Sequence, residues 1–239
     1  MIDDKNVLAV VTARGGSKGL PGKNKKLLLG KPLVCYPLSI AQNSKYVDKI
    51  FLTTDDKEIQ EIGKNMGVYC PELRPKHLSN DKATSFSVLE YVINSEKKLG
   101  NSYEYLILLE PTSPLTQASD IDLAIESLNE QKSTADSIVG ISLNESSHPN
   151  FVVKLDEDNF IQTFNTQYTV QRRQDLEPAY FFDGSLYISK VDSLLKTKSF
   201  YHTKTLGYKT KKWQSFEIDD IVDFICVEAI MKNLEKIRE

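Results

Sequence analysis

Short apolar runs alternate with amphipathic segments along most of the chain, and this alternation limits the possible folds more than any other feature. The runs at 6–12, 49–54 and 105–109 are typical of strands that are buried on both faces. Residues between and after them show helical or strand spacing, which predicts helices at 32–44, 56–66, 85–99 and 119–131 and strands at 68–70 and 138–143. This order predicts an α/β protein in three layers, with a mostly parallel sheet between helices.

The regular alternation stops after residue 143. Short β-like pieces at 151–154 and 160–164 follow without a clear helix, before a strand expected at 184–189 and a final helix expected at 219–237. We therefore predict one domain over residues 1–239, with a β-rich insertion at 144–182. Such an insertion has exposed strand edges and needs a cover or a partner strand, so we expect it to form a homodimer contact and to act as a lid over a site.

Composition excludes several classes of protein. The chain has 239 residues and a formal charge of -3, whereas a nucleic-acid-binding domain is usually clearly basic. The apolar runs at 7–11 and 106–109 fall far short of the ~20 residues that a membrane span needs. The three cysteines form no CxxC pair, so neither a zinc site nor a disulfide framework is indicated. No signal peptide is evident, and we expect a cytoplasmic protein that binds neither nucleic acid nor membrane.

The segment directly after the first predicted strand is rich in glycine and basic residues. It reads ARGGSKGLPGKN over residues 13–24, with four glycines and the cations Arg14, Lys18 and Lys23. Glycines allow successive backbone N–H groups to point inward, and three nearby cations favour a polyanion such as a triphosphate. Neither a Walker A motif nor a GxGxxG fingerprint is present, which argues against P-loop enzymes and nicotinamide enzymes. The alternative is a solvated turn with incidental lysines.

This loop resembles the acylneuraminate cytidylyltransferases, or CMP-sialic acid synthetases, whose signature is ARxxSKGLPxKN. Further similar segments extend the resemblance over nearly the whole chain: 53–55 (TTD), 73–75 (LRP) followed by Asp81 and Ser85, 111–115 (PTSPL), 173–174 (RQ), and Gly184 with 187–188 (YI). The resemblance implies a Rossmann-like nucleotidyltransferase fold and a homodimer joined through the insertion. It also implies a reaction in which CTP activates an acidic nine-carbon 2-keto sugar.

The resemblance also implies roles for individual residues. The expected nucleotide-binding residues are Arg14, Gly15, Gly16, Ser17, Lys18, Lys23, Asn24, Arg74 and Ser85. The expected sugar-binding residues are Glu110, Thr112, Ser113 and Arg173. The expected catalytic residues are Arg14, Lys23 and Asp219. From the residues alone, Arg74 is also compatible with a surface charge and Ser85 with a helix cap.

Two carboxylates near the C-terminus form a candidate metal site. Glu217 and Asp219 are two residues apart in a segment expected to be extended, so both would point to the same face. Mg²⁺ prefers one or two carboxylates together with phosphate oxygens and water. The alternative, in which Asp219 or Asp220 caps the final helix and Glu217 is solvated, stays open from the residues alone. The resemblance favours the metal.

Three positions depart from the family pattern. Glu110 replaces a glutamine, Thr116 replaces an arginine, and Glu217 replaces an aspartate. A carboxylate beside an acidic sugar needs a cationic or hydrogen-donating substituent nearby, so a legionaminic-type or pseudaminic-type sugar is as compatible as sialic acid. Two alternatives remain: a cytidylyltransferase for an eight-carbon 2-keto sugar acid, and a nucleotide-sensing domain without catalysis.

Overall fold

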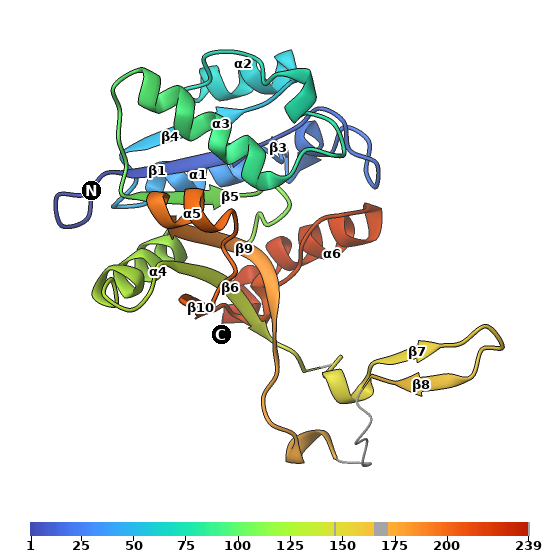
Figure 1. Ribbon diagram of the computed structural model, residues 1–239. Coiled ribbons are helices and arrows are strands. Elements are labelled where there is room, and N and C mark those ends of the chain that lie inside the picture. The colour runs from blue at the N-terminus through green and yellow to red at the C-terminus, as the bar shows by residue number, and fades with distance from the viewer. Residues whose placement is uncertain (146, 165–171, 239) are drawn as a thin grey trace.

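A six-stranded sheet forms the centre of the computed structural model, which describes residues 1–145, 147–164 and 172–238. Its strand order is β10-β6-β9-β5-β1-β4, and only β9 runs antiparallel to its neighbours (Figure 1). The strands of this sheet are β1 (Val7–Thr12), β4 (Lys49–Thr53), β5 (Tyr105–Leu109), β6 (Ser137–Leu143), β9 (Tyr180–Lys190) and β10 (Thr205–Lys209). The mostly parallel sheet is thus confirmed.

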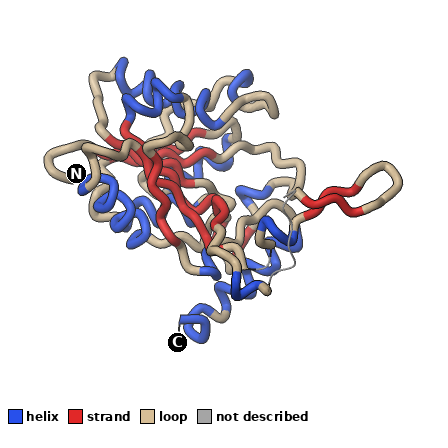
Figure 2. The backbone as a smooth tube through the Cα atoms, turned by 60° about the horizontal axis from the view of Figure 1, so that its bottom comes forward, coloured by secondary structure: helices blue, strands red, loops and turns tan. Residues whose placement is uncertain are grey.

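Helices cover both faces of the sheet and complete the three expected layers (Figures 1 and 2). One buried apolar cluster joins the sheet to α1, α2 and α4, and a second cluster joins its opposite face to α3 and α5. The helices are α1 (Cys35–Asn43), α2 (Lys57–Asn65), α3 (Ser85–Lys98), α4 (Ala118–Glu130), α5 (Val191–Thr197), α6 (Ile221–Lys232) and α7 (Leu234–Arg238). Among the described residues, no helix has the length and apolar character that crossing a membrane requires.

A third apolar cluster fixes the C-terminal part of the chain against the segment after the glycine loop. Phe224 and Val227 of α6 pack with Leu28 and Leu33, and Ile218 is fully buried in the same cluster. The short strands β2 (Leu27–Leu28) and β3 (Lys31–Pro32) form a small antiparallel pair within that segment. This packing brings residues 215–220 beside the glycine loop, although the two segments are far apart in the sequence.

Several predicted elements have different boundaries. The first helix begins at Cys35 rather than at residue 32, because Pro32 pairs with Leu27 in the antiparallel pair. The strand expected at 68–70 is only an isolated bridge between Tyr69 and Phe51. Helix α3 is capped by Thr84, whose hydroxyl accepts from the Ser87 N–H, and not by Ser85.

The C-terminal region contains two elements that the sequence did not predict, α5 and β10. The expected helix at 219–237 is divided into α6 and α7 at Asn233. Asp220 caps α6 by accepting from the N–H groups of Val222 and Asp223, which confirms the capping alternative for that residue.

The insertion expected at 144–182 forms an arm that projects from the sheet (Figures 1 and 2). Its main element is a hairpin of β7 (Val153–Leu155) and β8 (Ile161–Thr163). Strand β9 begins at Tyr180, two residues before the expected end of the insertion, because it pairs with the end of β6. Residues 146 and 165–171 of the predicted insertion lie outside the described residues.

Candidate active site

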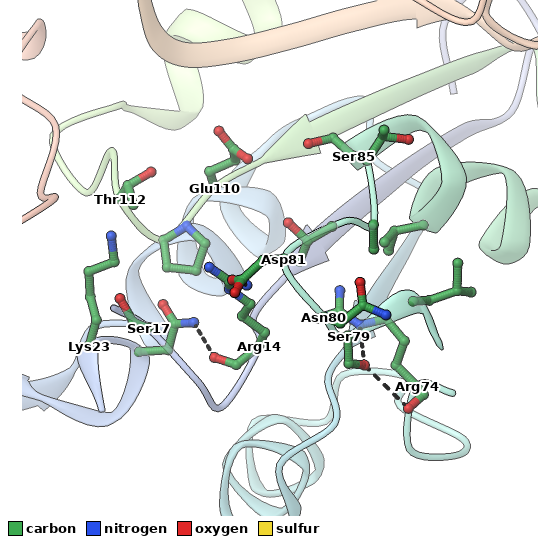
Figure 3. Close-up of a pocket in the computed structure, with 17 residues that line it drawn as sticks. Arg14, Ser17, Lys23, Arg74, Ser79, Asn80, Asp81, Ser85, Glu110 and Thr112 are labelled. Carbon is green, nitrogen blue, oxygen red and sulfur yellow. Dashed lines mark hydrogen bonds and ion pairs between the residues drawn. The ribbon is translucent and has the colours of Figure 1, made fainter. Parts of the chain in front are cut away.

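A cavity of about 310 Å³ opens where the parallel strands β1, β4 and β5 end (Figure 3). The carboxyl ends of these strands meet at one edge of the sheet, which is where open α/β sheets bind ligands. The cavity is lined by Thr12, Arg14, Ser17, Lys23, Asn24, Arg74, Leu78, Ser79, Asn80, Asp81, Ala83, Thr84, Ser85, Val88, Glu110, Pro111 and Thr112.

The glycine loop forms one wall of this cavity and is held by contacts within the chain. The Asn24 amide donates to the Arg14 carbonyl at 2.9 Å and closes the loop on itself. The Gly15 N–H donates to the Asp55 carboxylate at 2.8 Å. Gly19 has no room for a side chain, because the carbonyl of Asp219 lies where a Cβ would be. Loop and C-terminal segment are therefore packed together at the cavity rim.

Lys23 is directed toward the C-terminal acidic segment. Its ammonium donates to the Ile218 carbonyl at 2.8 Å and lies 3.3 Å from the Asp219 carboxylate. The Lys23 side chain is 11% exposed, whereas that of Asp219 is 82% exposed. A nearly buried ammonium in the wall of this cavity is well placed to bind an anionic oxygen, because little water screens it.

Arg74 is buried in the opposite wall. Its Nε donates to the Ser79 hydroxyl at 3.2 Å (Figure 3). Its backbone N–H donates to the Thr54 carbonyl at 2.7 Å. Burial lowers the pKa of the guanidinium, and the nearby Asp55 partly opposes this effect. Among the described residues no carboxylate forms an ion pair with Arg74. A buried cation of this kind is unlike a surface charge and favours an anionic or polar ligand group.

Asp81 lies across the cavity mouth from the glycine loop and contacts two of its cations. One carboxylate oxygen is 2.8 Å from Arg14 Nη1, and the other is 2.7 Å from Lys18 Nζ. Figure 3 shows Asp81 beside Arg14. Hydrogen bonds from Lys18 and Arg14 lower the pKa of this carboxyl, so it is ionised at neutral pH.

Glu110 follows β5 and separates the first cavity from a second one of about 240 Å³. Burial raises the pKa of its carboxyl, Lys23 opposes this rise, and Asp219 adds to it. The walls of the second cavity are mainly apolar and aromatic. They comprise Thr84, Ser85, Phe86, Leu108, Glu110, Tyr187, Leu194, Lys198, Ser199, Phe200 and Tyr201.

Glu217 is half-buried near Glu110 and is fixed by its neighbours. The Ser113 hydroxyl donates to the Gly184 carbonyl at 3.0 Å and lies 3.3 Å from Glu217 Oε1. Gly184 has a φ of 66° and leaves no space for a Cβ, because the Glu217 carboxylate lies against it. Burial, followed by the charge of Glu110, raises the pKa of Glu217 to about 7. Glu110 and Glu217 are thus two neighbouring carboxylates in a partly buried place, and a nearby cation would stabilise their charged forms.

Eight of the residues predicted from the sequence line the first cavity together: Arg14, Ser17, Lys23, Asn24, Arg74, Ser85, Glu110 and Thr112. Three further predicted residues lie next to the cavity. Lys18 contacts Asp81, Asp219 contacts Lys23, and Ser113 contacts Glu217. Gly15 and Gly16 belong to the loop but not to the cavity lining. Arg173 begins a short 3-10 helix in the arm, and its side chain lies outside the described part of the chain.

The sequence analysis assigned no role to Ser79, Asn80 or Asp81, or to the aromatic residues of the second cavity. Asp81 entered the sequence analysis only as part of the family resemblance, and its contacts with Arg14 and Lys18 depend on tertiary packing. Tyr187 likewise entered only through the resemblance. Phe200 and Tyr201 had no local signal, because β9 and the segment after α5 bring the three aromatic residues together from separate parts of the chain.

The fold and the cavity together are those of a Rossmann-like α/β protein whose crevice, at the carboxyl edge of the sheet, is lined with basic and hydroxyl side chains. The chain belongs to the cytidylyltransferase family, since the family model matches residues 8–238. It is 31% identical over 97% of its length to an N-acylneuraminate cytidylyltransferase of Escherichia coli O18:K1:H7, of which it covers 54%. It thus spans about half the length of that relative.

Two shorter relatives match from end to end. A CMP-N,N'-diacetyllegionaminic acid synthase of Legionella pneumophila is 31% identical over 95% of this chain and 96% of the relative. A pseudaminic acid cytidylyltransferase of Campylobacter jejuni strain 81-176 is 33% identical over 94% of this chain and 96% of the relative. Among solved structures, a CMP:2-keto-3-deoxy-manno-octonic acid synthetase complexed with CTP has a TM-score of 0.69 at 15% identity, covering 96% of this chain and 99% of that one. The last similarity concerns the fold alone.

Proposed function

We propose that this protein is a cytidylyltransferase that activates an acidic nine-carbon 2-keto sugar with CTP, giving the CMP-sugar and pyrophosphate. The observation that supports this most is the cavity itself. It combines Arg14, Lys23 and Arg74 at the carboxyl edge of a sheet whose chain belongs to the cytidylyltransferase family. Relatives named for sialic, legionaminic and pseudaminic acids support a nine-carbon substrate.

The reaction is a direct displacement at phosphorus. The anomeric hydroxyl oxygen of the sugar forms a bond to the α-phosphorus of CTP, the bond to the bridging oxygen of pyrophosphate breaks, and the hydroxyl proton is released. The protein contributes position and charge, as in other phosphoryl-type transfers. Lys23 and Arg14 neutralise phosphate oxygens, while Arg74 and Ser85 contact the nucleotide from the opposite wall.

Glu217 and Asp219 fit a magnesium ion by the chemistry of their side chains. They are hard oxygen donors, and burial together with the charge of Glu110 raises the pKa of Glu217, an effect that a bound cation would offset. The described residues contain no cluster of three or more metal-binding side chains. Mg²⁺ needs only one or two carboxylates when substrate phosphates supply the other oxygens. The ion would neutralise charge on the phosphate oxygens.

We assign the sugar to the second cavity. Glu110 lines both cavities and would therefore contact the sugar on the side that faces the nucleotide, while the remaining walls of the second cavity are mainly apolar. The Glu110 carboxyl is half-buried, and burial raises its pKa, so it needs a donor from the substrate or its own proton. Amide N–H groups on an amino-substituted nonulosonate would supply such donors.

We also propose that the arm joins two copies of the chain into a homodimer. Every residue of β7 and β8 is exposed, including Leu155 and Ile161, and Phe160 between them is 70% exposed. Apolar side chains gathered on a projecting hairpin favour a partner surface. CTP, a sugar acid and a second copy are thus the partners in this proposal, with the cytoplasm as the site of action.

Pyrophosphate release tests the function. The assay combines CTP and Mg²⁺ with N-acetylneuraminic acid, a legionaminic-type acid, a pseudaminic-type acid and an eight-carbon 2-keto sugar acid, each in turn. We expect turnover with at least one nine-carbon acid and none without a sugar. Turnover with the eight-carbon acid alone supports the alternative enzyme. CTP binding without turnover on any sugar supports a nucleotide-sensing domain.

A further inference from the structure

Two of the three glycine-loop cations are paired with a carboxylate that belongs to a different element. Asp81 joins Arg14 at 2.8 Å and Lys18 at 2.7 Å, and we call this set of contacts the Asp81 bridge. The exposed fractions of the three side chains are 39% for Arg14, 51% for Asp81 and 81% for Lys18. The bridge therefore spans the open mouth of the cavity, in water, and not its buried floor.

We propose that Asp81 is an exchangeable counter-anion of the phosphate site: CTP phosphates displace it from Arg14 and Lys18, and it returns as pyrophosphate leaves. This inference rests on the proposed function, since it assigns the two cations to the triphosphate. A carboxylate and a phosphate group present similar anionic oxygens to the same donors. The two anions compete for these donors, because an N–H that donates to the Asp81 carboxylate is not available to a phosphate oxygen.

The loop that contains Asp81 can release it without unfolding. Asn80, its neighbour, donates to the His77 carbonyl at 3.0 Å and accepts from the Lys82 N–H at 2.8 Å. These bonds shape the loop independently of the Asp81 carboxylate. Among the described residues, Arg14 and Lys18 are the only partners of that carboxylate. Its departure therefore breaks the bridge and nothing else.

The loop backbone around Arg14 remains in place when the bridge breaks. The loop is closed by Asn24, which binds the Arg14 carbonyl, and by Asp55, which binds the Gly15 N–H. Lys23 provides a contrast, because its ammonium is held by a backbone carbonyl as well as by Asp219 and is nearly buried. The glycine loop thus contains one cation that stays in place, Lys23, and two cations that exchange their anion, Arg14 and Lys18.

The bridge lowers the affinity of the site for phosphates. A contact made only in the free protein stabilises that state, and the ligand must overcome this stabilisation. Two exposed ion pairs of this kind contribute little each, so removal of the bridge should tighten phosphate binding by about three- to tenfold. The same factor applies to CTP and to pyrophosphate, because both use the same cations. The bridge thereby assists product release.

Titration calorimetry on the full chain, with CTP and with inorganic pyrophosphate, tests the proposal. Asp81→Asn removes the charge with minimal change in shape, and Asp81→Ala excludes new contacts from the amide. Asp136→Asn is the matched control. Asp136 also contacts two lysines, Lys190 at 2.8 Å and Lys204 at 3.6 Å, but precedes β6 at the opposite edge of the sheet.

We expect both Asp81 variants to bind CTP and pyrophosphate about three- to tenfold more tightly, while Asp136→Asn stays at the wild-type value. In turnover, KM for CTP and the inhibition constant of pyrophosphate should fall by the same factor in the Asp81 variants. Equal or weaker binding of both ligands by these variants overturns the proposal, as does an equal gain in Asp136→Asn.

The two proposals fail separately. If the wild type binds pyrophosphate but not CTP, and Asp81→Asn tightens pyrophosphate alone, the bridge is supported and the cytidylyltransferase assignment is lost. If CTP is turned over normally and the Asp81 variants show weaker binding, Asp81 is a ligand of the nucleotide and the bridge is wrong. A wild type that binds neither ligand contradicts both.

Discussion

The cavity and the arm place their side chains in opposite environments: charged groups are partly buried at the cavity, and apolar groups are exposed on the arm. At the cavity, residues from the glycine loop, the end of β5 and the C-terminal segment contact one another, and Lys23 is 11% exposed. On the arm, apolar side chains of β7 and β8 point into solvent, and Phe160 is 70% exposed. The cavity is therefore defined by the chain itself, whereas the arm has the surface of a molecule that needs a second one.

The family resemblance implies both phosphate binding and association of two chains, and we assign them to different regions. Phosphate binding depends on contacts within one chain, so it should tolerate changes in the arm. Association depends on exposed apolar surface, so it should tolerate changes in the cavity. Each of the following predictions tests one side of that separation.

Lys23→Ala should have the largest effect. The ammonium is nearly buried beside the acidic segment, and loss of one preorganised charge at a transferring phosphoryl group lowers turnover by about a hundredfold or more. The fold should persist because Lys23 begins a short 3-10 helix (Lys23–Lys25) that belongs to none of the three layers of the fold. Pyrophosphate release and circular dichroism measure the two properties. Lys31→Ala, which changes an exposed lysine of β3, is the control, and near-wild-type kcat/KM in Lys23→Ala would show that the loop is not the phosphate site.

Glu110→Gln should change the choice of sugar. An amide donates and accepts hydrogen bonds, whereas the ionised carboxylate only accepts them. We expect kcat/KM to shift toward N-acetylneuraminic acid, relative to the native sugar, by roughly several-fold to a hundredfold, which corresponds to about 1–3 kcal/mol. The measurement is the ratio of kcat/KM for the two sugars in both proteins. An unchanged ratio means that Glu110 does not contact the sugar.

The pH dependence of kcat/KM should report Glu217. Burial and the charge of Glu110 raise its pKa to about 7, so the side chain is neutral at lower pH and cannot hold a cation. We expect kcat/KM to fall by up to about tenfold per pH unit below that value. Glu217→Gln should give a lower plateau without this decrease. A wild-type profile that matches Glu217→Gln would assign the decrease to the substrate.

The same raised pKa has a consequence for stability. The folded state holds the Glu217 proton more tightly than the unfolded state, in which the pKa is near the ordinary value of 4.5. Its unfavourable contribution is therefore absent below pH 4.5 and complete above about 7. Urea unfolding across this range should show wild type losing stability relative to Glu217→Gln as the pH rises. Parallel curves would contradict the raised pKa.

Charged substitutions on the arm should leave the cavity unaffected. The double variant with Phe160→Glu and Ile161→Lys places charges where both residues are 70% exposed. We expect light scattering to show a monomer, while affinity for pyrophosphate stays within about twofold of wild type. Leu99→Glu, at another exposed apolar residue, is the control and should remain dimeric. A wild-type monomer at micromolar concentration, or a large loss of pyrophosphate affinity in the double variant, breaks the separation.

The sequence predicted elements best where burial is uniform. Strand β5 has the predicted boundaries, since all of its residues are buried and form one apolar run. Strand β10 and helix α5 were missed, because β10 is only half-buried and α5 has seven residues, which gives little periodicity. In the site, the composition of the glycine loop was enough to predict its cations. The partners of these cations, Asp81 and the Ile218 carbonyl, depend on tertiary packing that no local pattern records.

Nucleotide choice tests the central claim most directly. The measurement is kcat/KM for CTP, UTP, ATP and GTP in pyrophosphate release, with Mg²⁺ and the best nine-carbon sugar acid. A cytidylyltransferase should strongly prefer CTP, because a wrong base leaves buried groups such as Arg74 unpaired, and discrimination on such grounds reaches about 10⁴-fold. Equal use of UTP would contradict the account, and would leave a nucleotidyltransferase without cytidine specificity.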